Sequence, residues 1–215
     1  MVKLVFLCTR KLGITHERYV ELLLKGHVPI ALRHHPTLRK YVVNIVEAAP
    51  PGAPLDSIGE LHFDTLADFR ARLYDSPEGR RVVEADVAGF MGQAAAYVVE
   101  EQVVRRGPDP GALGKRSPAV KIMTCLRRAA ALDAKTFLAH WREHRPFETI
   151  GGTESLAGYV RDTVTDRLSS HAPPWDGIET RYLSPDSRDL AVTTCGAPFV
   201  SECVSYRVAE YVQKL

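Results

Sequence analysis

The stretch Val-Lys-Leu-Val-Phe-Leu-Cys-Thr at positions 2–9 opens the chain, and its beginning returns 118 residues later as Val120-Lys121-Ile122. The run is almost continuously apolar, which is typical of a strand that is covered on both faces. From this start the two halves of the chain match without a gap over about forty positions. A period of this length predicts two related domains rather than a solenoid of small repeats.

Aligned positions keep their character through the first helix and the second strand. Thr15 falls on Asp133, Tyr19 on Phe137, Leu23 on Trp141, Leu38 on Leu156 and Tyr41 on Tyr159. At the same offset His27 falls on Arg145, so the two halves carry different ionisable side chains, a histidine and an arginine, at this position. We therefore expect two sites that have diverged, one of them open and polar at its base and the other filled or closed.

Composition and charge describe an ordinary globular protein. The 215 residues include 28 Lys and Arg against 26 Asp and Glu, and the basic residues are dispersed, which gives no footprint for a nucleic acid. No apolar run approaches a membrane span. The start is too short, and too soon interrupted by Lys3, Arg10 and Lys11, for a signal peptide. These features predict a cytoplasmic protein without a nucleic-acid or membrane partner.

Hydrophobic periodicity predicts the same β-α-β-β-α-β order in each half. In the first half we expect strands at 2–9, 41–46, 58–63 and 95–104, and helices at 16–34, 66–74 and 77–89. In the second half we expect strands at 120–127, 159–165, 177–183 and 202–211. Thr15 and Asp133 are predicted helix N-caps.

The predicted fold class is α+β. Residues 1–104 form a first ferredoxin-like repeat, residues 105–118 a Gly/Pro-rich linker, and residues 119–215 a second repeat. Each four-stranded sheet carries helices on one face only, so its other face needs a cover. The two sheets are expected to supply it to each other as an intrachain dimeric α/β barrel, in a monomer with a pseudo-dimeric core or in a homodimer.

The pattern resembles the EthD family of the dimeric α/β barrel superfamily, in tandem form. In the first half the resemblance rests on His27-Val28-Pro29 at the helix end, on Leu38 to Val42, on Asp56 to Asp64 and on Ser76-Pro77-Glu78-Gly79. In the second half it rests on Phe137 to His144, Leu156 to Tyr159 and Trp175 to Ile178. The second half departs from the family where His becomes Arg145 and Pro becomes Phe147. The resemblance implies cyclases, dehydratases, cofactor-free monooxygenases or isomerases of small molecules, and the fold does not choose among them.

Four residues of the first half are catalytic candidates. His27 has an imidazole suited to general acid/base work near neutral pH, or it is a helix-end residue that satisfies backbone carbonyls. Tyr41 either donates its phenol hydrogen to a developing oxyanion or is a core aromatic. Glu60 and His62 share one face of their strand; they line the cavity, or they point to solvent.

The second half offers candidates for substrate binding. Tyr159 stands at the position of Tyr41, and Tyr182 at that of His62. Arg145, beside His144, offers a planar donor fork to a carboxylate or enolate, or simply pairs with a surface carboxylate.

We predict a cofactor-free acid/base enzyme, a dehydratase, cyclase or isomerase of a small apolar ring or polyketide-like carbonyl compound, bound between sheet and helices. His27 is the expected base, Tyr41 or Tyr159 the oxyanion donor, and Glu60 with His62 a supporting pair. Two alternatives stay open: a cofactor-free monooxygenase of a hydroquinone-type substrate, and a non-catalytic small-ligand carrier. No cofactor is expected, because the chain lacks phosphate-loop, nicotinamide and flavin fingerprints. No metal site is expected at His34-His35, since adjacent helical residues diverge by about 100°.

Overall fold

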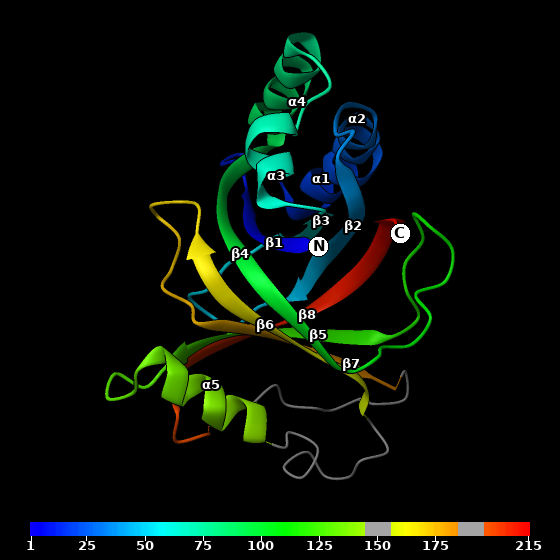
Figure 1. Ribbon diagram of the computed structural model, residues 1–215. Helices are drawn as coiled ribbons and strands as arrows, with labels where there is room; N and C mark the ends of the chain where they lie inside the picture. The colour runs from blue at the N-terminus through cyan, green and yellow to red at the C-terminus, as the bar shows by residue number, and fades with distance from the viewer. Residues whose placement is uncertain (145–155, 185–195) are drawn as a thin grey trace.

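The computed structural model describes residues 1–144, 156–184 and 196–215, which form a closed barrel with helices outside it (Figure 1). The strands are β1 (Val2–Arg10), β2 (Leu38–Ala48), β3 (Ser57–Phe63), β4 (Met91–Arg105), β5 (Val120–Arg128), β6 (Leu156–Arg167), β7 (Gly177–Leu183) and β8 (Val200–Lys214). The helices are α1 (His16–Glu21), η1 (Leu22–His27), α2 (Val28–His34), α3 (Leu66–Arg72), α4 (Pro77–Phe90) and α5 (Ala134–Glu143).

The ring runs β1-β3-β2-β8-β5-β7-β6-β4, and every neighbouring pair is antiparallel. The first half of the chain thus contributes four adjacent strands, β4-β1-β3-β2, and the second half contributes β8-β5-β7-β6. Two seams join them, with Ile45 opposite Ala209 in one and Glu101 opposite Asp162 in the other. The predicted α+β class with a barrel is confirmed, and its two sheets are also hydrogen-bonded along both seams.

Alternation along the strands divides the side chains between the barrel interior and its outer surface. Val5, Tyr97 and Ile178 belong to an apolar cluster, in which strands from all around the barrel meet. Lys3 and Lys121, which also point inward, are buried beside acidic side chains. The interior therefore has an apolar part and a charged part.

The helices before β4 cover the outer face of the first four strands, and α5 lies on the opposite side of the barrel (Figure 1). The two predicted caps are confirmed: Thr15 accepts a hydrogen bond from Arg18 N, and Asp133 accepts one from Thr136 N. The helix predicted at 16–34 is present, but its middle turn, η1, is π-helical. Within the described residues, no helix combines the length and the apolar character needed to cross a bilayer.

Candidate functional site

A cavity of about 260 Å³ lies between the helices and the outer face of the first four strands. Its wall is mainly apolar and includes Phe6, Leu23, Leu61, Val83 and Met91. A small apolar cavity with few polar groups is the usual setting for a small-molecule site. We call it the helix-side pocket, and its polar members include His27, His35 and Tyr41.

His27 is the last residue of η1 and lies at the wall of this pocket. π-helical turns inside longer helices recur at functional sites, because they change the direction of the side chains that follow. Nδ1 of His27 lies 2.8 Å from Oδ2 of Asp86, and a carboxylate only accepts, so Nδ1 donates. Nε2 is thus the ring nitrogen that remains available to a ligand.

Burial lowers the pKa of His27 below its ordinary value, although the bond to Asp86 acts in the opposite direction. At neutral pH the imidazole is therefore neutral and can accept a proton. The ring of Phe90 packs against it at a centroid distance of 5.6 Å. The side chain of His27 is thus oriented by Asp86 and neutral, and its role as a base stays a prediction.

Asp86 is a functional candidate that we did not predict from the sequence. It lies on α4 between Val83 and Phe90, on the stripe that this helix buries. The helix is fixed at its start by Ser76, whose hydroxyl accepts a hydrogen bond from Gly79 N at 2.9 Å. A carboxylate on an otherwise apolar stripe is the sequence signal that could have identified it.

Tyr41 reaches the same pocket from β2, with its ring buried against the sheet. Burial raises the pKa of its phenol above the ordinary value, so the hydroxyl stays protonated and can donate. His35 also lies at the pocket wall; its Nδ1 lies 3.1 Å from the carbonyl of Leu73, and burial lowers its pKa. The pocket thus combines two neutral imidazoles and a protonated phenol.

The prediction that Glu60 and His62 support His27 is wrong. The two residues share a strand face, as predicted, but this face points into the barrel. Glu60 is opposite Val42 in the β2–β3 ladder, whereas Tyr41 is opposite Leu61. Residues opposite each other in a ladder point the same way, so Glu60 and Tyr41 lie on opposite faces of the sheet.

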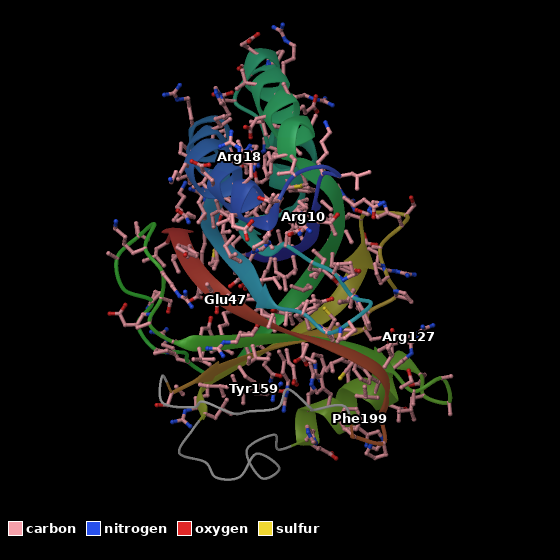
Figure 2. The ribbon with its side chains drawn as sticks, turned by 180° about the vertical axis from the view of Figure 1, so that it is seen from behind. Arg10, Arg18, Glu47, Arg127, Tyr159 and Phe199 are labelled. Atoms are coloured by element: carbon pink, nitrogen blue, oxygen red, sulfur yellow. The ribbon has the colours of Figure 1, made fainter. Side chains whose placement is uncertain are left out.

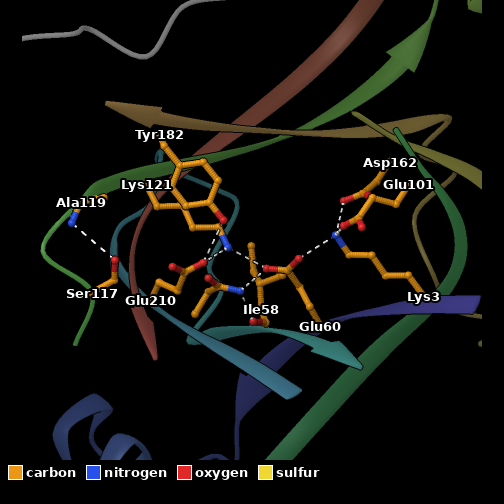
Figure 3. A network of polar contacts seen from close by, with 11 residues as sticks. Lys3, Ile58, Glu60, Glu101, Ser117, Ala119, Lys121, Asp162, Tyr182 and Glu210 are labelled. Carbon is orange, nitrogen blue, oxygen red and sulfur yellow. Dashed lines mark hydrogen bonds and ion pairs between the residues drawn. The ribbon is translucent and has the colours of Figure 1, made fainter. Parts of the chain in front are cut away.

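Glu60 is at the centre of a buried network inside the barrel (Figure 3). Its Oε2 lies 2.7 Å from Lys3 Nζ, and its Oε1 lies 2.7 Å from Lys121 Nζ. Lys3 also contacts Glu101 and Asp162, both at 2.8 Å. Burial opposes the charged form of Glu60, but the two ammonium groups outweigh it and hold its pKa well below the usual range.

Tyr182 belongs to this interior network and not to a second helix-side site. Its hydroxyl donates to Oε1 of Glu210 at 2.9 Å, and the ammonium of Lys121 lies 5.2 Å from its ring centroid. Lys121 in turn lies 2.6 Å from Glu210. Burial raises the pKa of Asp162, at the other end of the network, to about 6.

His62 gives the interior a measurable pH dependence. Burial, followed by the charge of Lys3, lowers its pKa to about 4. The unfolded chain takes up this proton near pH 6.5, so the stabilisation is complete above that pH and is lost as the pH falls towards 4. In urea unfolding between pH 7 and pH 4.5, we expect the free energy of unfolding of wild type to fall by on the order of 2 kcal/mol more than that of His62→Gln. If the free energy of unfolding changes with pH in the same way for both proteins, His62 is not held neutral in the folded state.

The outer face of the second four strands differs from that of the first. Tyr159, at the place of Tyr41, donates its hydroxyl hydrogen to Glu179 at 2.9 Å, and it lies on the α5 side of the barrel (Figure 2). Arg161 and Glu179 face each other across the β6–β7 ladder. Val43 and Gly59 do so at the matching step of the β2–β3 ladder. A charged pair thus stands where the helix-side pocket has its apolar wall.

His144 directly follows α5, and its backbone carbonyl accepts a hydrogen bond from Arg161 at 2.8 Å. Its ring meets Phe199 edge-on at 5.4 Å. Arg145 and Phe147 lie outside the described residues, so the predicted role of Arg145 stays a prediction. Of the predicted site residues, the structure brings His27 and Tyr41 together, places Glu60, His62 and Tyr182 inside the barrel, and leaves Tyr159 and His144 on the opposite side.

The rings of His34 and His35 do not converge, as expected for neighbours on a helix. Nδ1 of His34 lies 3.0 Å from Asp75, whereas His35 bonds to Leu73. Among the described residues, the group with metal-ligand spacing is instead Glu60, His62 and Glu101, whose ligand atoms lie within 4.8 Å of one another.

The structure is thus a closed antiparallel α+β barrel with outer helices and a small pocket beneath those helices. Residues 11–94 match the EthD domain family, so the predicted resemblance is confirmed over this part of the chain. The match includes His27, Tyr41 and Asp86. A search of curated proteins finds no match to the chain.

Solved structures share the fold over nearly the whole chain. An "anthrone oxidase-like protein" aligns with a TM-score of 0.61 and 10% identity, covering 99% of this chain and 93% of that one. A "putative monooxygenase" from Lactobacillus acidophilus NCFM aligns with a TM-score of 0.55 and 8% identity, covering 99% and 96%. A "Putative monooxygenase" from Fusobacterium nucleatum aligns with a TM-score of 0.57 and 8% identity, covering 99% of this chain and 94% of that one. At these identities the likeness concerns the fold.

Proposed function

We propose that this protein is a cofactor-independent oxygenase of a small, largely apolar ring compound that carries an acidic C–H next to a carbonyl. The observation that carries the proposal is the His27–Asp86 pair at 2.8 Å, at the wall of an apolar pocket of about 260 Å³. The names of the structural neighbours add support for oxygenation over the dehydration, cyclisation or isomerisation that we expected first.

The reaction begins with proton transfer. Neutral His27 takes a proton from the ring methylene through Nε2, and Asp86 stabilises the imidazolium that forms. Tyr41 donates a hydrogen bond to the carbonyl oxygen, on which negative charge develops. The apolar wall keeps water away from the carbanion.

The carbanion then passes its electrons to dioxygen, which is the co-reactant. One oxygen atom becomes the new ring carbonyl, and the other leaves as water with the two hydrogens of the methylene. The four electrons released in turning CH₂ into C=O equal the four that reduce O₂, so no external reductant is needed.

Oxygen uptake with an anthrone as the probe substrate tests this proposal. We expect uptake above the rate of spontaneous oxidation, without an added cofactor and in the presence of a chelator. With ¹⁸O₂, one labelled atom should appear in the new carbonyl. Binding of the probe in the helix-side pocket without any uptake above the spontaneous rate would favour the carrier alternative.

We also propose that the chain is a tandem of two ferredoxin-like repeats, 1–104 and 119–215, joined by the linker 105–118. The strand orders β4-β1-β3-β2 and β8-β5-β7-β6 support this division, since each repeat would contribute its strands in the same order. Co-expression of residues 1–108 and 115–215 as separate chains is expected to give a folded heterodimer, because two long ladders join the repeats. Recovery of each fragment alone as a stable monomer would contradict the dependence of each repeat on the other.

A further inference from the structure

The barrel interior contains a cluster of side chains that the proposed oxygenase reaction does not use. Glu60 and His62 come from β3 and Glu101 from β4, and one ligand atom of each lies within 4.8 Å of the others. Tetrahedral ligands of one zinc ion at about 2.1 Å lie about 3.4 Å apart, so the three side chains need to close by up to about 1.4 Å. Two carboxylates and one imidazole are a common donor set for divalent transition metals.

The ionised side chains of the barrel interior carry a net negative charge that a divalent cation would balance. The ion pairs of this network join two ammonium groups to four carboxylates: Lys3, Lys121, Glu60, Glu101, Asp162 and Glu210. In their ionised forms these groups sum to two negative charges. One divalent ion brings the sum to zero, and buried charge is stable only when it is compensated.

A second, independent observation is a buried carboxylate oxygen beside the cluster that has no hydrogen-bond partner among the described residues. Asp162 is completely buried, and its Oδ2 lies 2.8 Å from Lys3, while its Oδ1 has no hydrogen-bond partner among the described residues. A buried carboxylate oxygen without a partner costs free energy. Figure 3 shows Asp162 beside Glu101, with both carboxylates turned towards the ammonium of Lys3.

An access path exists. Glu60 and Glu101 both line a second cavity, of about 720 Å³, whose wall also includes residues 106–110. The side chain of Glu101 keeps 32% of its surface exposed, so an ion can reach it from solvent. Three protein ligands leave coordination positions open towards this cavity.

Lys3 is the competitor for the site. Its ammonium lies 2.7 Å from Glu60 and 2.8 Å from Glu101, between the carboxylates that would hold a metal. It also contacts Asp162 at 2.8 Å, so it can keep one carboxylate while it releases two. Glu60 can likewise keep Lys121 through its other oxygen.

We propose that Glu60, His62 and Glu101 form a divalent-cation site inside the barrel, separate from the helix-side pocket, at which the metal ion and the ammonium of Lys3 exchange. Zn²⁺ is the probe, because it accepts carboxylate and imidazole ligands together. The site is independent of His27 and Asp86, so it stands or falls separately from the proposed function.

Calorimetric titration of untagged, chelator-treated protein with Zn²⁺ tests the site. Wild type is expected to bind one ion per chain. His62→Ala and Glu101→Gln are each expected to weaken binding at least about tenfold. The matched control is Glu210→Gln, which changes a carboxylate of the same network that is not a proposed ligand and should leave the affinity within about threefold of wild type.

Thermal unfolding of two lysine variants supplies a second measurement. Lys3→Met and Lys121→Met each remove one ammonium from the network, but only the first empties the place that the metal would take. Zn²⁺ is expected to raise the Tm of Lys3→Met by several degrees more than that of Lys121→Met. If Lys3→Met does not fold, the titrations of wild type and His62→Ala decide alone.

Two results would overturn the site. If neither wild type nor Lys3→Met binds Zn²⁺, the ammonium of Lys3 is the permanent cation of this cluster. If His62→Ala and Glu101→Gln bind as tightly as wild type, the ion lies elsewhere on the protein.

Discussion

Replacing His27 by alanine is expected to lower kcat/KM for the oxygenated substrate by about a hundred- to ten-thousand-fold, with the fold intact. The reason is that His27 is the proposed base of the reaction, a neutral imidazole that Asp86 holds through Nδ1 at 2.8 Å. Oxygen uptake measured against substrate concentration gives this value. Thermal unfolding of the variant checks that the barrel persists.

The matched control is His34→Ala. His34 bonds to Asp75 at 3.0 Å, so it forms the same kind of pair one helix further on, and it is not among the residues that line the helix-side pocket. Full activity is expected of this variant. Equal losses in His27→Ala and His34→Ala would mean that both act on the fold, and full turnover in His27→Ala would remove it as the base.

Asp86→Asn separates positioning from proton transfer. Asp86 raises the pKa of His27 against the effect of burial, so its neutralisation should lower that pKa further. The rate falls as the pH drops through the pKa of the base, and this acid limb is therefore expected to move to lower pH in Asp86→Asn. An unchanged acid limb would show that the limb belongs to another group.

Lys121→Met is expected to destabilise the protein by about 3–5 kcal/mol, because it leaves two buried carboxylates without their shared cation. The ammonium of Lys121 lies 2.7 Å from Glu60 and 2.6 Å from Glu210, and only 1% of the side chain is exposed. Methionine keeps most of the volume, so the loss reports the charge rather than a cavity. For a chain of this size the Tm should fall by roughly 6–20 °C.

Arg127→Met supplies the comparison for this prediction. Arg127 forms an ion pair with Glu202 at 3.4 Å, and about half of each side chain is exposed. Exposed pairs contribute about 0–1 kcal/mol, so this variant should unfold close to wild type. Similar losses in the two variants would mean that burial of the Lys121 network carries no special cost.

The sequence predicted the strands and the faces they present, but not which face points inward. Period-two alternation placed Glu60 and His62 together correctly. The direction of that face depends on the ladder with β2, in which Glu60 pairs with Val42 and not with Tyr41. Register between strands is a long-range property, and a single strand does not encode it.

The prediction of the pocket was incomplete for a similar reason, because its contacts join residues that are far apart in the sequence. His27 and Tyr41 were identified by their chemistry and by the resemblance to a family. Asp86 follows His27 by 59 residues and meets it only because α4 packs against η1. The π-helical turn at Leu22–His27 was also missed, because its residues continue an ordinary helical pattern.

The closed ring of strands has a consequence for how copies of this protein meet one another. Each of the eight strands is hydrogen-bonded on both sides, so the barrel has no open edge along which another chain could add a strand. Edge-to-edge growth, the usual route from a sheet to an ordered aggregate, therefore requires a ladder such as β4–β6 or β2–β8 to open first. Contacts between folded copies are left to the side chains of helices and loops.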